Sequence, residues 1–206
     1  MKENVKGKQF KTWEDFLAFG ISAIFSPYVV AVLFVVLLTY NYSQNLSQFL
    51  PWVLTFLVFG IIIPGIYVLW LMETEKIHDI HISDRNERKI PFLIAGISST
   101  IGAVLLIILG AARPVIVMAV TYAVNALAVA VITAYWKISI HMALLTSIIT
   151  VAVILFGYNF AWFYFLLLPL AWSRVHRKKH TILQALAGSL LAFILTAVVF
   201  WGFKYF

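Results

Sequence analysis

The chain has 206 residues and no cysteine, which excludes disulfide bonds and thiolate chemistry. Charged residues are also scarce: Asp, Glu, Lys and Arg make up 11% of the chain, whereas soluble domains carry about 25%. Acidic residues are missing altogether after Glu87. A site built only from residues 88–206 therefore cannot use a carboxylate as a base, a metal ligand or a charge partner.

Apolar residues dominate instead: they make up 63% of the chain, and the mean hydropathy is +0.99. A helix needs about 20 apolar residues to cross the hydrocarbon core of a bilayer. The sequence contains several runs of this kind, so we predict an all-α, polytopic membrane bundle in which residues 1–206 form one domain. We expect seven spans, at about residues 16–40, 50–72, 90–112, 115–135, 138–156, 160–172 and 181–203.

Two of these spans have alternatives. We expect Pro27 to kink the first span, or to divide it into an interfacial helix up to Phe25 and a shorter span. The sixth run, residues 160–172, is short for a bilayer, so a bundle of six spans is the alternative to seven.

The Lys and Arg residues are unevenly distributed along a chain whose net charge is +7. With seven spans, 13 of the 15 cations fall on one face, and the other face carries only Arg113 and Lys204. The five histidines lie on or beside the first face: His78, His81, His141, His176 and His180. Because cytoplasmic loops are enriched in Lys and Arg, we place this face in the cytoplasm. We expect its partners to be the lipid bilayer and an anionic substrate, and not nucleic acid.

The most unusual segment is the basic connection between the last two apolar runs. Ser173 and Arg174 are followed by five residues and then by His180, and Gln184 comes four positions later. Cations and imidazoles are costly near hydrocarbon, which favours a functional role for these side chains. The alternative is a positively charged loop that leads into a helix, with Thr181 as N-cap and Gln184 completing a capping box.

Two further segments lie on the same predicted face. Residues 136–141 read Trp-Lys-Ile-Ser-Ile-His and supply Lys137, Ser139 and His141. Residues 84–91 end in Ile-Pro and supply the cations Arg85, Arg88 and Lys89. Taken singly, the first pattern is also typical of a helix start and the second of a solvated loop.

Taken from the N-terminus to the C-terminus, the three segments resemble the signatures of the type 2 phosphatidic acid phosphatase superfamily. Those signatures are Lys, six residues, Arg-Pro; then Pro-Ser-Gly-His; then Ser-Arg, five residues, His, three residues, Asp. This chain has Ser83 and Ile90 in place of the Lys and the Arg, lacks the Pro and Gly of the second signature, and has Gln184 in place of the Asp. The resemblance extends over residues 26–188. The chain also resembles a divergent prokaryotic branch of this superfamily, whose members have Trp-Lys-Ile-Ser-x-His and His-Thr-x-x-Gln.

The resemblance implies a metal-independent lipid phosphatase in the cell membrane of a prokaryote, with no cofactor. His180 would attack phosphorus and form a phosphohistidine, and His141 would protonate the leaving oxygen. Gln184 would orient the His180 ring through its side-chain oxygen, without the charge that the family's Asp supplies. The phosphate would be bound by Arg174, Ser139, Arg85, Arg88, Lys89 and Lys137. The substrate would be a polyprenyl phosphate or diphosphate, or a phosphatidate-type lipid.

Two other functions are alternatives to hydrolysis. A non-catalytic lipid-binding protein or a transporter would fit the altered second signature and the missing Asp. A membrane prenyltransferase would use the acidic and basic residues at 78–79 and 84–85 to bind magnesium diphosphate. That chemistry needs a second acidic cluster, and no acidic residue follows Glu87. We also expect no metal site at the loop residues His78, Asp79 and His81.

Overall fold

The structure of the protein, a computed structural model, describes residues 12–77, 87 and 89–206. These residues form helices joined by short connections, and they contain no β-strand, so the all-α prediction is confirmed for this part of the chain. The elements are α1 (Trp13–Ile24), α2 (Pro27–Tyr42), α3 (Leu46–Leu57), η1 (Val58–Ile62), α4 (Ile63–Glu73), α5 (Lys89–Ile108), α6 (Arg113–Thr133), α7 (Ile140–Phe156), η2 (Tyr158–Leu166), α8 (Leu167–His176) and α9 (Ile182–Gly202).

Several helical segments of the described chain are long and apolar enough to cross a membrane. There are five of them: Trp13–Tyr42, Leu46–Glu73, Lys89–Ile108, Arg113–Thr133 and Ile182–Gly202. Helix α7 is apolar but has only 17 residues. The short run expected as a sixth span forms the 3₁₀ helix η2 and the start of α8, which continues through Arg174 to His176. The structure supports a helical membrane bundle, and it does not confirm a count of seven spans.

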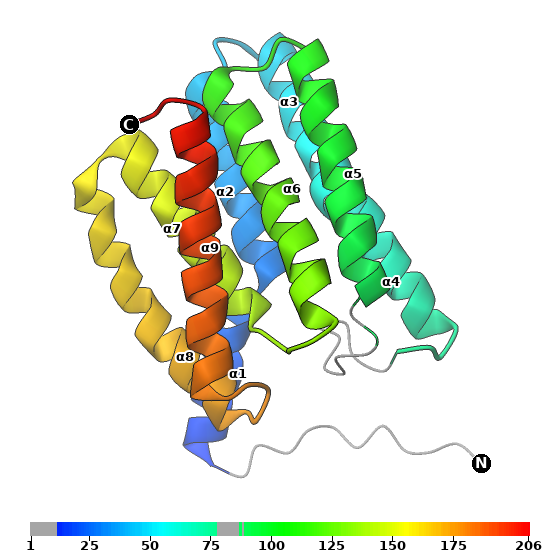
Figure 1. Ribbon diagram of the computed structural model, residues 1–206, viewed down its shortest axis with the longest axis vertical. Coiled ribbons are helices and arrows are strands. Elements are labelled where there is room, and N and C mark those ends of the chain that lie inside the picture. Colours follow the sequence, from blue (N-terminus) through cyan, green and yellow to red (C-terminus); the bar gives the residue numbers. More distant parts are fainter. Residues whose placement is uncertain (1–11, 78–86, 88) are drawn as a thin grey trace.

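The first apolar segment is divided into two helices at Pro27, which is the alternative to a single kinked helix. Helix α1 ends at Ile24, and Pro27 is the first residue of α2, where its fixed φ suits a helix start. Between them the backbone of Ser26 is extended, with ψ of 136°. The division lets α1 pack against α8 while α2 packs against α3, α6 and α7 (Figure 1).

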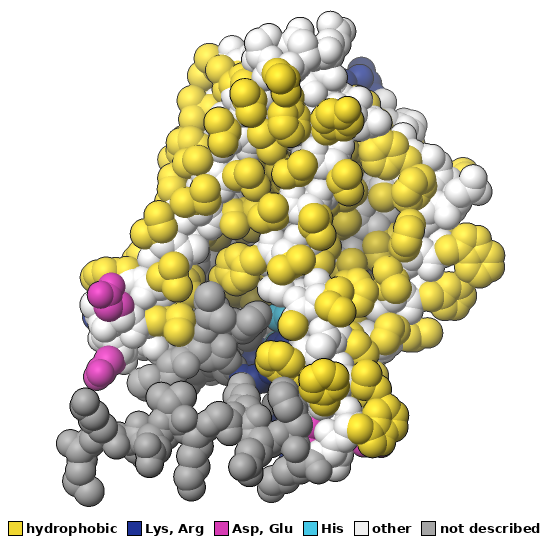
Figure 2. Space-filling view, turned by 180° about the vertical axis from the view of Figure 1, so that it is seen from behind, with side chains coloured by type: hydrophobic (Ala, Val, Ile, Leu, Met, Phe, Trp, Pro, Cys, Tyr) yellow, Lys and Arg dark blue, Asp and Glu magenta, His cyan; other side chains and the backbone are white. Residues whose placement is uncertain are grey.

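The core of the bundle is apolar and closely packed. The largest fully buried side chains come from α2, α5, α8 and α9 and from Ile138 before α7: Phe200, Leu38, Leu106, Ile138 and Leu170. Gly102 of α5 lies against η1, where an added Cβ would stand 2.7 Å from the Cβ of Phe59. Small residues let membrane helices approach in this way. The outer surface is also largely apolar, as expected of a surface that faces lipid (Figure 2).

The two ends of the bundle differ in charge. The C-terminal end of α4 and the connections that follow α6 and α8 lie at the lower end in Figure 1. The described cations of these connections and of the helix ends beside them are Lys76, Lys89, Lys137, Arg174, Arg177, Lys178 and Lys179. The upper end has Lys204 and Arg113, whose guanidinium donates a hydrogen bond to the carbonyl of Phe203. In the described chain, the basic segments therefore share one end, as predicted.

The absence of cysteine makes this topology simple to test, because single cysteines can be introduced without background. We expect Lys76→Cys and Lys178→Cys to react with an impermeant maleimide from the cytoplasmic side, because the positive-inside rule places the basic end there. Asn159→Cys, at the other end, should react only from the opposite side. Labelling of positions 76 and 178 from opposite sides of sealed vesicles would contradict a single basic face.

Candidate functional site

One cavity brings together the three most informative residues of the sequence. It lies among α2, α4, α5, α6 and α7, and its wall includes His141, Arg174 and His180. Their side chains are deeply placed: His141 is 3% exposed, Arg174 4% and His180 7%. The cavity volume is about 140 Å³. Figure 2 shows a histidine and cationic side chains set back among apolar ones near one end of the molecule.

The start of α7 is fixed against α9, which places His141 at the cavity. Ser139 is the N-cap residue of α7, and its backbone N–H donates to the backbone carbonyl of Gln184 over 3.1 Å. One helical turn further along α9 is Gly188, where an added Cβ would lie 2.5 Å from the Ser139 carbonyl oxygen. Such an approach has room only for glycine, because the opposing atom is backbone and cannot rotate away.

Arg174 is held by α1, which sequence analysis did not include in the site. In the last turn of α8, the Nη1 of Arg174 donates to the Oγ of Ser22 over 2.8 Å. The hydroxyl of the preceding residue, Ser173, donates to the carbonyl of Ala18 over 2.6 Å. Both contacts are buried. They fix the guanidinium on the cavity side of α8.

A tight turn after α8 returns the chain so that His180 lies beside Arg174. The backbone N–H groups of Lys179 and His180 donate to the Arg174 carbonyl over 3.1 and 3.3 Å. Lys178 takes a left-handed conformation with φ of 53° within this turn. Arg174 and His180 are thus positioned by one short hydrogen-bonded loop, although five residues separate them in the sequence.

The placement of Gln184 corrects the role predicted for it. His180 precedes the helix, because Thr181 is the N-cap of α9, so the two side chains are not neighbours on one helical face. The side-chain oxygen of Gln184 accepts the backbone N–H of Thr181 over 3.2 Å, and the Thr181 hydroxyl accepts the N–H of Gln184 at the same distance. This is a capping box, the alternative interpretation of the sequence, and it occupies the oxygen that was expected to orient the imidazole.

The capping box predicts how Gln184 behaves on substitution. Gln184→Ala removes the acceptor of the Thr181 N–H, and Thr181→Ala removes the acceptor of the Gln184 N–H. Each variant loses one bond of the capping box, so both should lower the stability of the protein by about 0.5–2 kcal/mol. Their effects on thermal unfolding in detergent, and on any activity, should be similar. A loss of activity in Gln184→Ala that is much larger than in Thr181→Ala would restore the orienting role.

Among the described residues, the other predicted phosphate ligands Ser139, Lys137 and Lys89 are not in the cavity wall. Ser139 is fully buried, and its Oγ makes no hydrogen bond within the described part of the chain. Lys137 is half-buried in the connection before α7, and Lys89 is exposed at the first position of α5. Arg85 and Arg88 lie outside the described residues, as do the predicted loop positions 78–86. Of the predicted phosphate ligands that the structure describes, Arg174 alone lines the cavity with the histidines.

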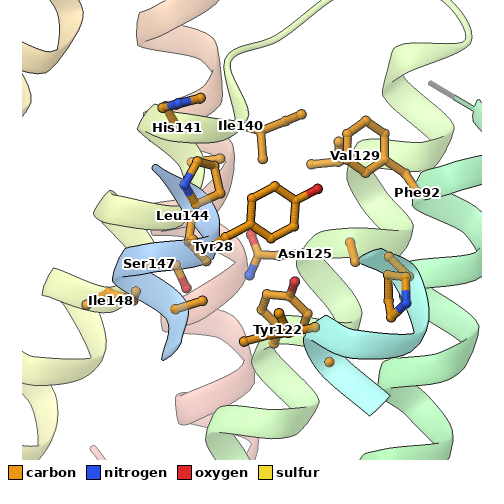
Figure 3. A pocket seen from close by; sticks show the side chains of 18 of the residues that line it. Tyr28, Phe92, Tyr122, Asn125, Val129, Ile140, His141, Leu144, Ser147 and Ile148 are labelled. Atoms are coloured by element: carbon orange, nitrogen blue, oxygen red, sulfur yellow. The ribbon is translucent and has the colours of Figure 1, made fainter. Parts of the chain in front are cut away.

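The cavity also contains polar side chains that sequence analysis missed. Tyr28 of α2, Tyr122 and Asn125 of α6, and Ser147 of α7 line it together with apolar residues (Figure 3). The available signal was Asn125, an amide in the middle of an apolar run, where polar side chains are costly and tend to be functional. Tyr28 and Tyr122 lie inside predicted spans, and nothing in the sequence distinguished them from the chain's other seven tyrosines.

The chemistry of the cavity is cationic and imidazole-based. Its described lining contains Arg174 and two histidines, and no Asp or Glu. Within the described residues no group of three or more His, Cys, Asp or Glu side chains is arranged to hold a metal ion. An anion is the ligand that this composition favours, because a guanidinium forms charge-assisted hydrogen bonds with phosphate or carboxylate oxygens.

Comparisons of the chain with models of known families, with curated proteins and with solved structures find no match. The resemblance to the phosphatase superfamily therefore stays a prediction carried by individual residues.

Proposed function

We propose that the protein is a membrane lipid phosphatase that hydrolyses a phosphorylated lipid through a phosphohistidine at His180. The observation that carries the proposal is that His141 lines the same cavity as Arg174 and His180, although it comes from a different segment of the chain. These residues stand at matching positions of the second and third phosphatase signatures. Chance burial of two histidines and an arginine at one cavity would be costly in an otherwise apolar bundle.

Arg174 is suited to bind the phosphate. A guanidinium has five N–H donors, so its contact with Ser22 is compatible with two further bonds to phosphate oxygens. Charge-assisted bonds of this kind also stabilise the charge that builds on the transferring phosphoryl group. Burial strengthens them because little water competes in the cavity.

The two histidines would divide the chemistry between them. A neutral His180 imidazole attacks phosphorus, the phosphorus–oxygen bond to the lipid breaks, and the leaving oxygen takes a proton from His141. In the second half His141 accepts a proton from water as that water attacks phosphorus. The phosphorus–nitrogen bond then breaks, which releases inorganic phosphate and restores both imidazoles.

The rest of the cavity suits the apolar part of a lipid. Its remaining lining is mostly aliphatic and aromatic, and it is supplied by α2, η1, α4, α5, α6 and α7. His141 lies at the start of α7 and Arg174 in the last turn of α8, and both of these helix ends are at the basic end of the bundle (Figure 1). An anionic headgroup would be attracted to this end. A lipid phosphate joins these two chemical properties in one molecule.

A non-catalytic lipid-binding protein is the second candidate. The observation that favours it is the capping box at Gln184, because no carboxylate among the described lining residues can stabilise a phosphohistidine cation. Binding would use the same Arg174 and the same apolar wall. The prenyltransferase alternative has less support, since its required second acidic cluster is absent after residue 87.

The test is phosphate release from phosphatidate and polyprenyl phosphates by the purified protein in excess chelator. We expect turnover without metal, its abolition in His180→Ala, and a loss of about 10²–10⁴-fold in His141→Ala, the usual range for a general acid–base group. His176→Ala is the matched control, because this histidine pairs with Asp15 of α1 over 3.0 Å and is not part of the cavity wall.

Two results would contradict the phosphatase proposal. Binding of lipid phosphates with no phosphate release would favour the lipid-binding candidate. Strict dependence on magnesium would favour a metal-based mechanism and remove the reason for a nucleophilic histidine.

A further inference from the structure

The cavity continues beyond the histidines to a group of polar side chains that phosphate chemistry does not use. Ser147 lies six residues after His141 in α7, about 9 Å further along the helix axis. Figure 3 shows Tyr122 and Asn125 on the Ser147 side of the cavity, with Tyr28 between them and His141. The Ser147 hydroxyl is already paired with that of Thr196 at 2.9 Å. Asn125 and the two tyrosines therefore supply the polar chemistry of this region.

The amide of Asn125 has a defined orientation. Its Nδ2 donates to the carbonyl of Thr121, one turn earlier in α6, over 2.9 Å. A carbonyl can accept only from the NH₂ end of an amide, so the oxygen must point away from Thr121. That oxygen, Oδ1, is buried and has no hydrogen-bond donor within the described residues. Asn125 thus presents an acceptor in a cavity whose wall is mainly apolar.

An acceptor of this kind favours a ligand with a hydroxyl group. A buried polar atom without a partner costs about 1–3 kcal/mol, and a ligand donor at this position would recover that free energy. The phenol groups of Tyr28 and Tyr122 lie in the same cavity and can donate to a carbonyl oxygen. A hydroxyl and an ester on adjacent carbons would satisfy both kinds of group. A purely hydrocarbon chain would satisfy neither.

We propose that Asn125, Tyr28 and Tyr122 form a second binding position, which accepts the hydroxyl and ester oxygens of a lipid whose phosphate is bound at Arg174. The position of the phosphate rests on the proposed function, whereas the oxygen-binding position rests on the side chains of α2 and α6. Ligands that lack these oxygens leave the amide unpaired, so the position discriminates between lipids by chemistry and not by chain length.

The experiment compares two single-chain lipids, oleoyl lysophosphatidate and oleyl phosphate, which differ in the glycerol ester unit. Their affinities are measured by titration of the full-length protein in detergent, with His180→Ala as the background so that turnover does not consume the lipid. We expect Asn125→Leu, which keeps the approximate size of the side chain, to weaken lysophosphatidate binding about tenfold or more, as loss of one buried hydrogen bond implies. Oleyl phosphate binding should change less than twofold.

The tyrosines provide milder substitutions in case Asn125→Leu does not fold. Tyr28→Phe and Tyr122→Phe should each weaken lysophosphatidate binding selectively. Tyr40→Phe is the matched control for Tyr28→Phe, because Tyr40 lies on the same helix and is 71% exposed. It should affect neither lipid.

The outcomes separate the two proposals. If lysophosphatidate binding depends selectively on Asn125 but the unmodified protein releases no phosphate, the second position is supported and the phosphatase proposal is contradicted. The second position alone is overturned if the unmodified protein hydrolyses both lipids and the Asn125 and tyrosine substitutions weaken the binding of both lipids equally, or of neither. If neither lipid binds, both proposals fail.

Discussion

The backbone contact between α9 and the start of α7 is the constraint on which the site depends. Gly188 brings α9 so close to the Ser139 carbonyl that no side chain fits between them, and the Ser139 N–H is bonded to the Gln184 carbonyl. These contacts set His141, two residues after Ser139, and His180, just before α9, at the same cavity. Backbone groups in a membrane bundle need partners inside the protein, so this pairing also satisfies a donor that α7 leaves open at its N-terminus.

The same cavity wall combines two environments that few ligands satisfy together. One end has Arg174, anchored by Ser22 of α1, and it lies at the basic end of the bundle. The other end is apolar apart from Asn125, Ser147 and two tyrosines. The break at Pro27 matters here, because it lets α1 reach α8 and fix Arg174 while α2 lines the deeper cavity. A lipid phosphate is the ligand class whose own polarity follows this division.

Composition and hydropathy predicted the fold class, and spacing predicted the three central residues. Apolar runs near 20 residues identify membrane helices, and the positions of His141, Arg174 and His180 followed from signature spacing. The sequence allowed two roles for Gln184, and the structure, with Thr181 as N-cap, shows its side-chain oxygen in the capping box. The anchoring of Arg174 by α1 could not be predicted, since it joins residues 152 positions apart through tertiary packing.

The central claim, that the contact between α9 and Ser139 assembles His141 and His180 into one working site, is tested most directly by Gly188→Ala. Gly202→Ala is the control, because it lies at the other end of the same helix and an added Cβ there meets nothing within 4 Å. Measured by phosphate release and thermal unfolding in detergent, Gly188→Ala should lose turnover and about 1–3 kcal/mol of stability, as overpacking against backbone implies. Gly202→Ala should keep both. Full turnover in Gly188→Ala would contradict the account.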